Sequence, residues 1–402
     1  MLLALGAGAV ALAAAPEPRL PPAISFEGAY TAEVLAVANG GLHRGAVFRG
    51  LAEAAVQADL AAFGAPAGSV FRLSALAPHG GDFSGTRLGD LQGASNIAAC
   101  NQPLLYELWL AGEFVDHRLD LRVGRLLADG DFATTDTGGV FLNGSFGWPA
   151  FISGNTRNAG PAFDRSALGA FAGVRLSQNL RVQAGVYDGD AIDDATGDPA
   201  AHANGLNFEL GHGQGAFAIV EVVFETVSGP AAAGRPGALK LGAWRHTAEF
   251  ADQFDPAQSH SGNHGIYLVA EQMLWRESDR GRGEPQGLTV FARTGVSPGD
   301  RSIFTQTADA GLGYTGLLPG READKFGLGL AWVRIGGDAR RAGCAAGAAV
   351  LPDYELTVEA SYEIAASERW RVVPDLQWVR HPGGSAARQD ALVLGLRTRL
   401  AF

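Results

Sequence analysis

Side chains suited to binding a polar solute alternate with apolar residues along several segments of this chain. They comprise charged groups, an imidazole, an amide and two indoles, which can form hydrogen bonds and cover flat apolar surfaces. No motif of a serine hydrolase, a zinc protease or a phosphate-binding loop accompanies them, so the chain is not expected to be an enzyme. The candidates for solute contact are Glu33, Arg49, Arg72, Glu107, Trp109, Arg122, Trp244, His246, Arg293, Asp375 and Gln377.

Catalytic and metal-binding alternatives have weaker support. His246 lies on a polar face without an indicated serine partner, and glycosidase-like carboxylate pairs stay open because a polar wall offers many of them. An acidic cluster could bind Ca²⁺, but its spacing differs from that of an EF-hand, and a solvated acidic loop is the simpler interpretation. We therefore expect no metal and no cofactor. The cluster consists of Asp188, Asp190, Asp193, Asp194 and Asp198.

The elements that must position these side chains are β-strands. In Asp353–Ala366, apolar residues from Tyr354 to Ile364 alternate with polar residues from Glu355 to Glu363. About seventeen segments with this period of two follow one another, separated by Gly, Pro, Asn and Asp. No linker or repeat divides them, so the sequence predicts one all-β domain.

The length of the segments favours a membrane barrel. Strands of about 10–13 residues are longer than the 5–6 of a soluble sandwich and match the 9–11 needed to cross a bilayer at a tilt. Trp370 and Trp378 lie near opposite ends of one apolar face, where aromatic girdles are expected. Short and long connections alternate. We predict a transmembrane antiparallel β-barrel with long outer loops. A bacterial barrel has an even number of strands, so we expect sixteen, with Leu206–Leu210 or a neighbouring segment wrongly counted as a strand.

Composition and the N-terminus agree with an exported membrane protein. The 402 residues are 47% hydrophobic, which excludes intrinsic disorder. A net charge of −11 argues against a nucleic-acid-binding protein. Residues 1–15 form an uncharged apolar run that predicts a signal peptide, with a small apolar N-terminal element as the alternative. Residues 16–402 are then a single outer-membrane β-barrel domain.

The connection Ala128–Leu168 is the most informative loop. Its length, glycines and aromatic residues indicate a functional segment rather than a disordered one. As the third long loop of a wide barrel, it is expected to fold inward and narrow the pore. The side chains predicted to act at this constriction are Asp129, Asp131, Asp136 and Trp148.

Short motifs spread over nearly the whole chain carry a family resemblance. In order, they include Tyr30-Thr31, Gly40-Gly41-Leu42-His43-Arg44-Gly45, Tyr106-Glu107-Leu108-Trp109, Leu121-Arg122-Val123-Gly124, Gly139-Val140-Phe141, Lys240-Leu241-Gly242-Ala243-Trp244, Glu271-Gln272-Met273-Leu274, Gly313-Tyr314-Thr315-Gly316-Leu317 and Pro374-Asp375-Leu376-Gln377-Trp378. Each is weak alone. With all of these motifs in this order, the chain resembles the carbohydrate-selective porins, the OprB-like outer-membrane channels.

The resemblance implies a sixteen-stranded barrel that lets sugars of the monosaccharide type diffuse across the bacterial outer membrane. Membrane lipid and the barrel-assembly machinery are the implied partners, and no nucleic acid is expected. A flat apolar outer patch could hold a homotrimer or simply face lipid. The chain departs from the family in its uncharged leader and in the stretch Asp188–Ala203, which leaves the preferred sugar open.

The polar residue types fit this implied solute. Arg and carboxylate groups can hydrogen-bond sugar hydroxyls, and aromatic rings can cover the C–H faces of the sugar. Trp109 and Trp244 are the strongest candidates for contact with a sugar ring, because each shares a strand face with charged residues. The alternatives are a solvated wall without specific sugar contact, a general non-selective porin, and a soluble β-rich periplasmic sugar-binding protein.

Two further features concern assembly and export. Cys100 and Cys344 are the only cysteines and are expected in outer loops, either joined by a disulfide or present as separate thiols. Phe402 ends the chain on the apolar face of the last predicted strand. It is predicted to act as a signal for the barrel-assembly machinery, with an interfacial anchor as the alternative.

Overall fold

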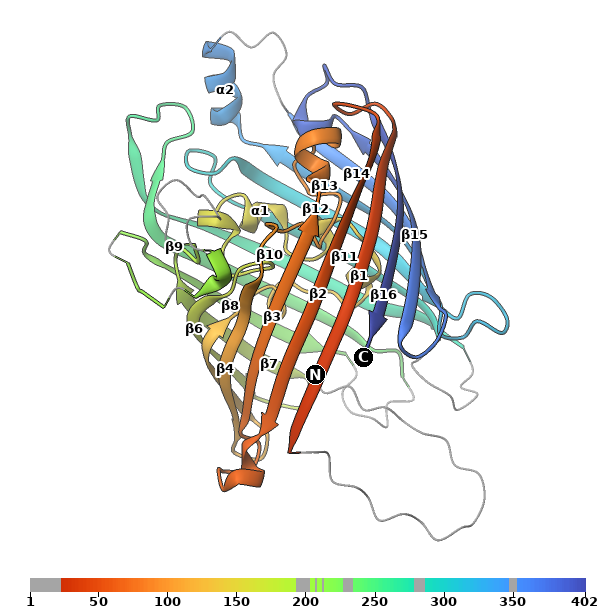
Figure 1. The fold of residues 1–402 in the computed structure, drawn as a ribbon. Coiled ribbons are helices and arrows are strands. Elements are labelled where there is room, and N and C mark those ends of the chain that lie inside the picture. The colour runs from red at the N-terminus through yellow and green to blue at the C-terminus, as the bar shows by residue number, and fades with distance from the viewer. Residues whose placement is uncertain are drawn as a thin grey trace.

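The computed structural model contains a closed antiparallel barrel of sixteen strands, as the sequence predicted (Figure 1). Each strand pairs with its neighbour in sequence, and β1 pairs with β16 to close the sheet. The predicted leader over residues 1–15 lies outside the described residues. The structure describes residues 23–192, 203–206, 208–211, 213–226, 234–277, 286–346 and 353–402.

The strands vary in length, and most are as long as a membrane crossing requires. Their bounds are β1 Ile24–Asn39, β2 Gly45–Asp59, β3 Val70–Gly80, β4 Leu104–Phe114, β5 Leu119–Leu126, β6 Ala167–Arg175, β7 Leu180–Asp188, β8 Ala216–Glu225, β9 Gly237–Ala251, β10 Ser259–Arg276, β11 Gly287–Val296, β12 Phe304–Thr315, β13 Lys325–Ile335, β14 Tyr354–Ala365, β15 Trp370–Arg380 and β16 Ala391–Ala401.

Helices occur only as short pieces in the connections that the structure describes. No helix among these residues is long and apolar enough to cross a membrane. Their bounds are α1 Ala150–Ser153, α2 Gly337–Ala345, η1 Leu60–Phe63, η2 Ser84–Leu88, η3 Thr137–Val140, η4 Gly144–Phe146, η5 Arg157–Ala159, η6 Ala203–Gly205 and η7 Pro382–Gly384.

The connections differ between the two ends of the barrel. The long ones, 81–103, 127–166, 189–215 and 336–353, all join strands at one end, which we call the outer end. The turns at the other end include the short 115–118, 176–179 and 366–369, and the C-terminus lies at this periplasmic end (Figure 1). The described residues of Leu206–Leu210 contain no strand, in agreement with its exclusion from the count.

Alternation along the strands separates a lipid-facing surface from an inner one. In β14, Glu355, Thr357 and Glu359 are fully buried and alternate with half-buried Leu356 and Val358. The outward positions around the barrel carry exposed apolar side chains, as a bilayer requires. Examples are Leu121, Val220, Leu268, Leu330, Leu376 and Leu394.

The inner face departs from the predicted pattern at β4. Strict alternation along β4 would place Leu104 and Tyr106 on the lipid-facing side with Leu108, but the pairing of β3 with β4 shifts register between Ser74 and Ala75. Leu104 therefore joins a buried cluster with Leu51, and Tyr106 packs against this cluster. The prediction failed here because strict alternation does not anticipate a β-bulge.

The two cysteines are free thiols. Cys100 is half-buried, and Cys344 is exposed at the end of α2. Of the two alternatives left open by the sequence, the structure therefore contains separate thiols rather than a disulfide.

The last residue helps to close the barrel. The backbone N–H of Phe402 donates to the carbonyl oxygen of Gly28 at 2.8 Å, which extends the β1–β16 pairing by one bond. Phe402 is 68% exposed, at the periplasmic end of the lipid-facing surface. This position suits either predicted role of Phe402.

Removing Phe402 should separate the two roles. We expect the truncated protein to refold in detergent, because a single terminal hydrogen bond contributes only about 1 kcal/mol. If Phe402 is an assembly signal, insertion in cells should slow and unfolded chain should collect in the periplasm, as measured by fractionation and heat-modifiable gel mobility. Normal outer-membrane levels would reject the signal role and leave an interfacial anchor.

Candidate functional site

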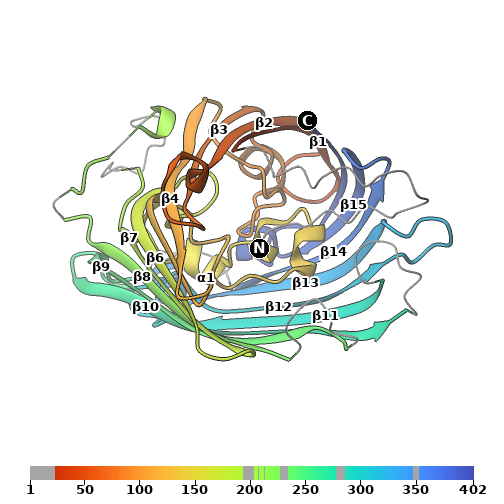
Figure 2. The same ribbon diagram turned by 90° about the horizontal axis from the view of Figure 1, so that it is seen from below.

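The loop 127–166 lies inside the ring of strands, together with part of the loop 81–103 (Figure 2). Loop backbone groups within the barrel need hydrogen-bond partners, because this segment forms little regular structure of its own. Inward-facing glutamates supply several of them. Glu271 accepts from the N–H groups of Asp136 at 2.9 Å and Thr137 at 2.7 Å.

Two further glutamates hold the same loop. Glu359 of β14 accepts from the backbone N–H groups of Leu142 and of Asn143, the latter at 3.1 Å. Glu221 of β8 accepts from the N–H of Ala133 at 2.9 Å, and its carboxylate also receives the hydroxyl of Tyr267. Bonds to a carboxylate are stronger than neutral ones, so each glutamate fixes a different part of the loop to the wall.

Arg293 satisfies the carbonyl groups of the loop. Its guanidinium donates to the carbonyl oxygens of Ala133 at 2.5 Å, of Gly147 at 2.8 Å and of Ser145. The same group forms an ion pair with Asp309 at 3.0 Å, and its side chain has no exposed surface. Arg293 therefore holds the loop and cannot contact a solute in this arrangement.

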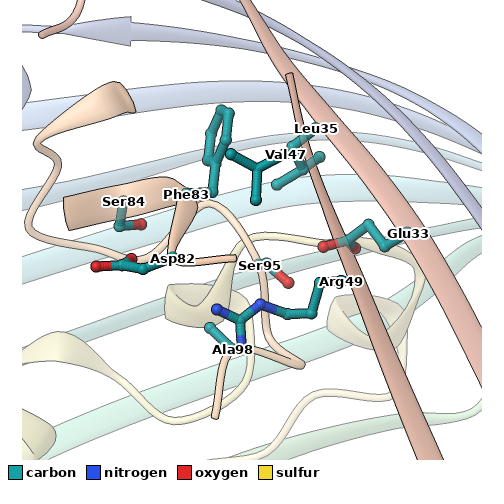
Figure 3. Close-up of a pocket in the computed structure, with 9 residues that line it drawn as sticks. All are labelled: Glu33, Leu35, Val47, Arg49, Asp82, Phe83, Ser84, Ser95 and Ala98. Atoms are coloured by element: carbon teal, nitrogen blue, oxygen red, sulfur yellow. The ribbon is translucent and has the colours of Figure 1, made fainter. Parts of the chain in front are cut away.

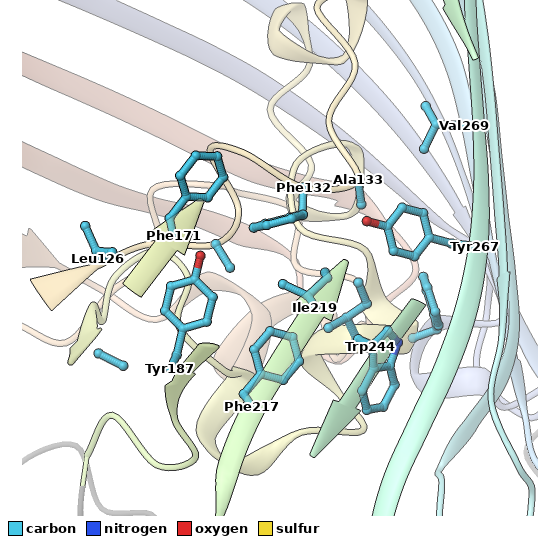
Figure 4. Packing of buried hydrophobic residues seen from close by; sticks show 14 residues of the cluster. Leu126, Phe132, Ala133, Phe171, Tyr187, Phe217, Ile219, Trp244, Tyr267 and Val269 are labelled. Carbon is cyan, nitrogen blue, oxygen red and sulfur yellow. The ribbon is translucent and has the colours of Figure 1, made fainter. Parts of the chain in front are cut away.

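Apolar packing seals the loop against the wall of β6 to β10. Phe132 and Phe151 of the loop are fully buried in a cluster that includes Phe217, Trp244 and Tyr267 from the strands. Figure 4 shows Phe132 beside the rings that Phe217, Trp244 and Tyr267 extend from the strands. Apolar side chains facing inward are thus explained by the loop that covers them.

The loop 81–103 is held in the same manner. Glu355 accepts from the N–H groups of Leu91 and Gln92, and Gln377 donates to the carbonyl oxygen of Ala94 at 2.9 Å. Beside this loop a small recess opens against β1 and β2, where Arg49 extends toward the loop (Figure 3). The sequence did not predict that this second loop also enters the barrel.

In the structure, several of the residues predicted to contact a solute are buried and do not face the open lumen. Trp244 is 2% exposed, and His246 is fully buried with Nε2 at 2.7 Å from the carbonyl oxygen of Gly189. Burial beneath loops or in ion pairs excludes direct solute contact in this arrangement. The residues placed in this way are Glu33, Arg49, Trp244, His246, Arg293, Asp375 and Gln377.

Three of the remaining predicted residues lie in one row on the inner wall, together with Glu27. Arg72 of β3 bridges Glu27 and Glu107, each at 3.2 Å. Trp109 of β4 donates from Nε1 to the other oxygen of Glu107 at 3.0 Å. We call Glu27, Arg72, Glu107 and Trp109 the lumen row. Its side chains are partly exposed, so it offers donors, acceptors and an aromatic surface together.

Arg122 extends this polar surface to the loop. It forms an ion pair with Asp131 at 2.6 Å and lies 3.9 Å from Asp120, and its guanidinium stacks over the ring of Phe171 at 4.0 Å. Arg181 approaches Asp120 from the other side at 3.6 Å. The arginines here are thus matched by carboxylates, and Asp131 brings the loop to the edge of the open lumen.

The other predicted loop residues have mixed positions. Trp148 donates to the carbonyl oxygen of Ala159 at 3.0 Å and packs against the ring of Phe217. Asp136 is exposed, while Asp129 accepts from the N–H of Phe163 at 2.8 Å. Of the four, Asp136 is exposed, and Asp129, Asp131 and Trp148 are half-buried.

The sequence did not single out the glutamate anchors, because they look like ordinary polar wall residues. Glu355 and Glu359 carried the right alternation, but only the folded loop shows what they bind. Within the acidic cluster, Asp190 accepts from Asn158 Nδ2 at 2.6 Å, whereas Asp193, Asp194 and Asp198 lie outside the described residues. Among described residues, no group of three or more His, Cys, Asp or Glu could hold a metal ion.

Comparison with known proteins gives the family. Residues 44–402 match the profile of the family described as carbohydrate-selective porin, OprB family. This chain belongs to that family. The family consists of channels, so this OprB-family porin is a carbohydrate-selective channel of the bacterial outer membrane.

Individual relatives are distant but extensive. Porin B of Pseudomonas aeruginosa is 24% identical over 83% of this chain and 77% of its own length. A putative porin, QuiX, of Acinetobacter baylyi is 23% identical over 74% of this chain and 69% of its own. The solved structure of OprB from Pseudomonas putida is 21% identical, covers 94% of both chains and has a TM-score of 0.83. That structure supports the fold of the porin.

Asp129 is the titratable group of the inward loop most affected by its surroundings. Burial raises the pKa of Asp129 from 3.8 to about 6, and the nearby carboxylate of Asp131 acts in the same direction. Because the pKa of the folded state exceeds that of the unfolded state, the folded porin binds this proton more tightly. Its stabilising contribution is complete below pH 3.8 and is lost as the pH rises through about 6.

Asp129→Asn should therefore remove part of the pH dependence of stability. We expect the urea midpoint of the wild-type porin in detergent to fall between pH 5 and pH 7.5, and the variant to show a smaller fall. At pH 7.5 the variant should be the more stable of the two, because it buries no charge. Equal pH dependence in both proteins would show that Asp129 is not the group responsible.

Proposed function

We propose that this porin passes neutral sugars of monosaccharide size along the lumen row and past the inward loop 127–166. The observation that carries the proposal is the continuous contact from Glu27 through Arg72 and Glu107 to Trp109. These groups come from β1, β3 and β4, so the barrel wall rather than a flexible segment holds them in place.

The charges of this surface favour neutral solutes with many hydroxyl groups. Arg72 and Arg122 each lie beside two carboxylates, so the surface can exchange hydrogen bonds without presenting an isolated positive charge. A flat indole beside them can cover the C–H face of a sugar ring. Binding at such a half-exposed surface is weak, as rapid passage requires.

The inward loop supplies the proposed size limit. Its backbone is tied to Glu221, Glu271 and Glu359 on different strands, and its apolar side chains are buried against the wall. A loop held at several points cannot be displaced by a solute without breaking charge-assisted hydrogen bonds. The free cross-section beside Asp131 then determines which solutes pass.

The alternatives make different predictions. A general porin would use the same barrel only as a size filter, without a contribution from Trp109. The soluble sugar-binding alternative is disfavoured by the exposed leucines around the closed barrel, such as Leu330 and Leu394. Contacts with the barrel-assembly machinery and formation of a homotrimer remain predictions.

Trp109→Leu tests whether the row contributes to selectivity. We expect the swelling rate of liposomes in monosaccharide to fall about threefold to tenfold, because an aromatic contact contributes about 1 kcal/mol. The rate for a zwitterionic amino acid of equal size should change less than twofold. Trp370→Leu, which replaces a 48% exposed tryptophan on the lipid-facing side, is the matched control and should leave both rates unchanged.

Equal losses for sugar and amino acid in Trp109→Leu would reduce the protein to a general porin. Absence of swelling by the wild-type protein with any solute would reject the proposed permeation pathway altogether.

A further inference from the structure

The lipid-facing surface carries unpaired positive charge at the outer end of β13 to β15. Arg334 is the second-last residue of β13, Tyr354 is the first of β14, and Arg380 is the last of β15. Both arginines are exposed. These strand ends lie near α2, away from the C-terminus (Figure 1).

Strand register places the three side chains on the outward face. Arg334 stands between Val333 and Ile335, which are buried on the inner side, and it pairs directly with Tyr354. Arg380 follows buried Val379 and pairs with Leu356, two positions along β14 from Tyr354. The backbone positions of the two arginines are thus two strands and two residues apart, roughly 12 Å.

These polar groups have no partner within the part of the chain that the structure describes. No carboxylate there forms an ion pair with Arg334 or Arg380, and the hydroxyl of Tyr354 has no hydrogen bond. The ring of Tyr354 lies against His381, with centroids 4.6 Å apart. The protein has a net charge of −11, yet these two arginines lie unpaired on one apolar face. An anion from outside the protein would neutralise them.

The two ends of this surface are chemically different. At the periplasmic end, the hydroxyls of Tyr314 and Tyr362 donate to Glu277 and Asp324 at 2.7 and 2.9 Å. At the outer end, Trp332 and Trp378 lie one outward step below Arg334 and Arg380, where an aromatic belt meets the headgroup region. Only the outer end thus combines this belt with unpaired arginines on β13 to β15.

We propose that Arg334, Tyr354 and Arg380 form a binding surface for the phosphate groups of an anionic glycolipid in the outer leaflet. Arginine can bind phosphate through two parallel hydrogen bonds, and a tyrosine hydroxyl can add a third donor. Trp332 and Trp378 would contact the sugar backbone and the upper acyl chains. The proposal is independent of the sugar pathway, because these side chains face away from the lumen.

A second copy of this chain fits the surface less well. A twofold contact between identical faces would bring Arg334 and Arg380 toward the same residues of the other copy, and like charges in a membrane repel strongly. A phosphorylated lipid supplies the opposite charge at the depth where the arginines lie. Charge complementarity therefore favours the lipid over a twofold contact of this face with a second copy.

The test is glycolipid binding to the purified full-length porin in detergent, measured by native mass spectrometry. The probes are diphosphorylated lipid A and the same glycolipid without phosphates. We expect Arg334→Gln/Arg380→Gln to weaken binding of the phosphorylated form about tenfold. The wild-type protein should prefer the phosphorylated form by a similar factor.

The control changes the same charges at the other membrane face. Arg118→Gln/Arg369→Gln replaces exposed arginines on the periplasmic turns 115–118 and 366–369 and should bind lipid A like the wild type. Unchanged single-channel conductance of the Arg334/Arg380 variant should show that its barrel is intact. Equal binding of the phosphorylated and dephosphorylated forms, equal losses in both double variants, or a change of oligomeric state without loss of lipid would overturn the proposal.

Discussion

Hydrogen bonds between inward-facing glutamates and loop backbone amides are the interactions on which the interior of this porin depends. A wide barrel cannot fill its own lumen, and a loop placed there brings many N–H groups that water reaches poorly. Glu221, Glu271 and Glu359 each accept N–H groups from the loop 127–166. Arg293 serves the carbonyl groups, so donors and acceptors of the loop are both satisfied. Substitution of an anchor would leave several loop groups without partners at once.

This arrangement divides the inner wall into two functions. Where the loops lie on the wall, its polar residues act as anchors and its apolar residues, such as Trp244 and Tyr267, form a core. Where no loop covers the wall, polar side chains such as Arg72 and Glu107 keep part of their surface exposed. One alternating strand pattern therefore produces a structural core in one sector and the proposed permeation surface in another.

The sequence was sufficient for the fold but only partly for the site. Alternation, strand length and the even-number rule gave the sixteen strands, because these follow from the geometry of a membrane barrel. The open residues Arg72, Glu107, Trp109 and Arg122 were also named correctly as inward-facing. Trp244 and Arg293 follow the same alternating pattern but are buried. Their burial depends on which part of the inner wall a loop distant in sequence covers. The bulge in β4 could not be predicted from the sequence either, because it is defined only by the pairing of β4 with β3.

Single-channel recording of a Glu221→Ala/Glu359→Ala variant tests the central claim most directly. If the glutamates hold the loop, the variant should show at least a twofold rise in conductance and larger open-channel noise, provided that heat-modifiable mobility shows a closed barrel. The charge-matched control is Glu53→Ala/Glu363→Ala, whose carboxylates pair with Arg399 and Arg371 and do not touch the loop. Conductance and noise that change equally in both variants would contradict the account, because the effect would then come from lost charge rather than from a released loop.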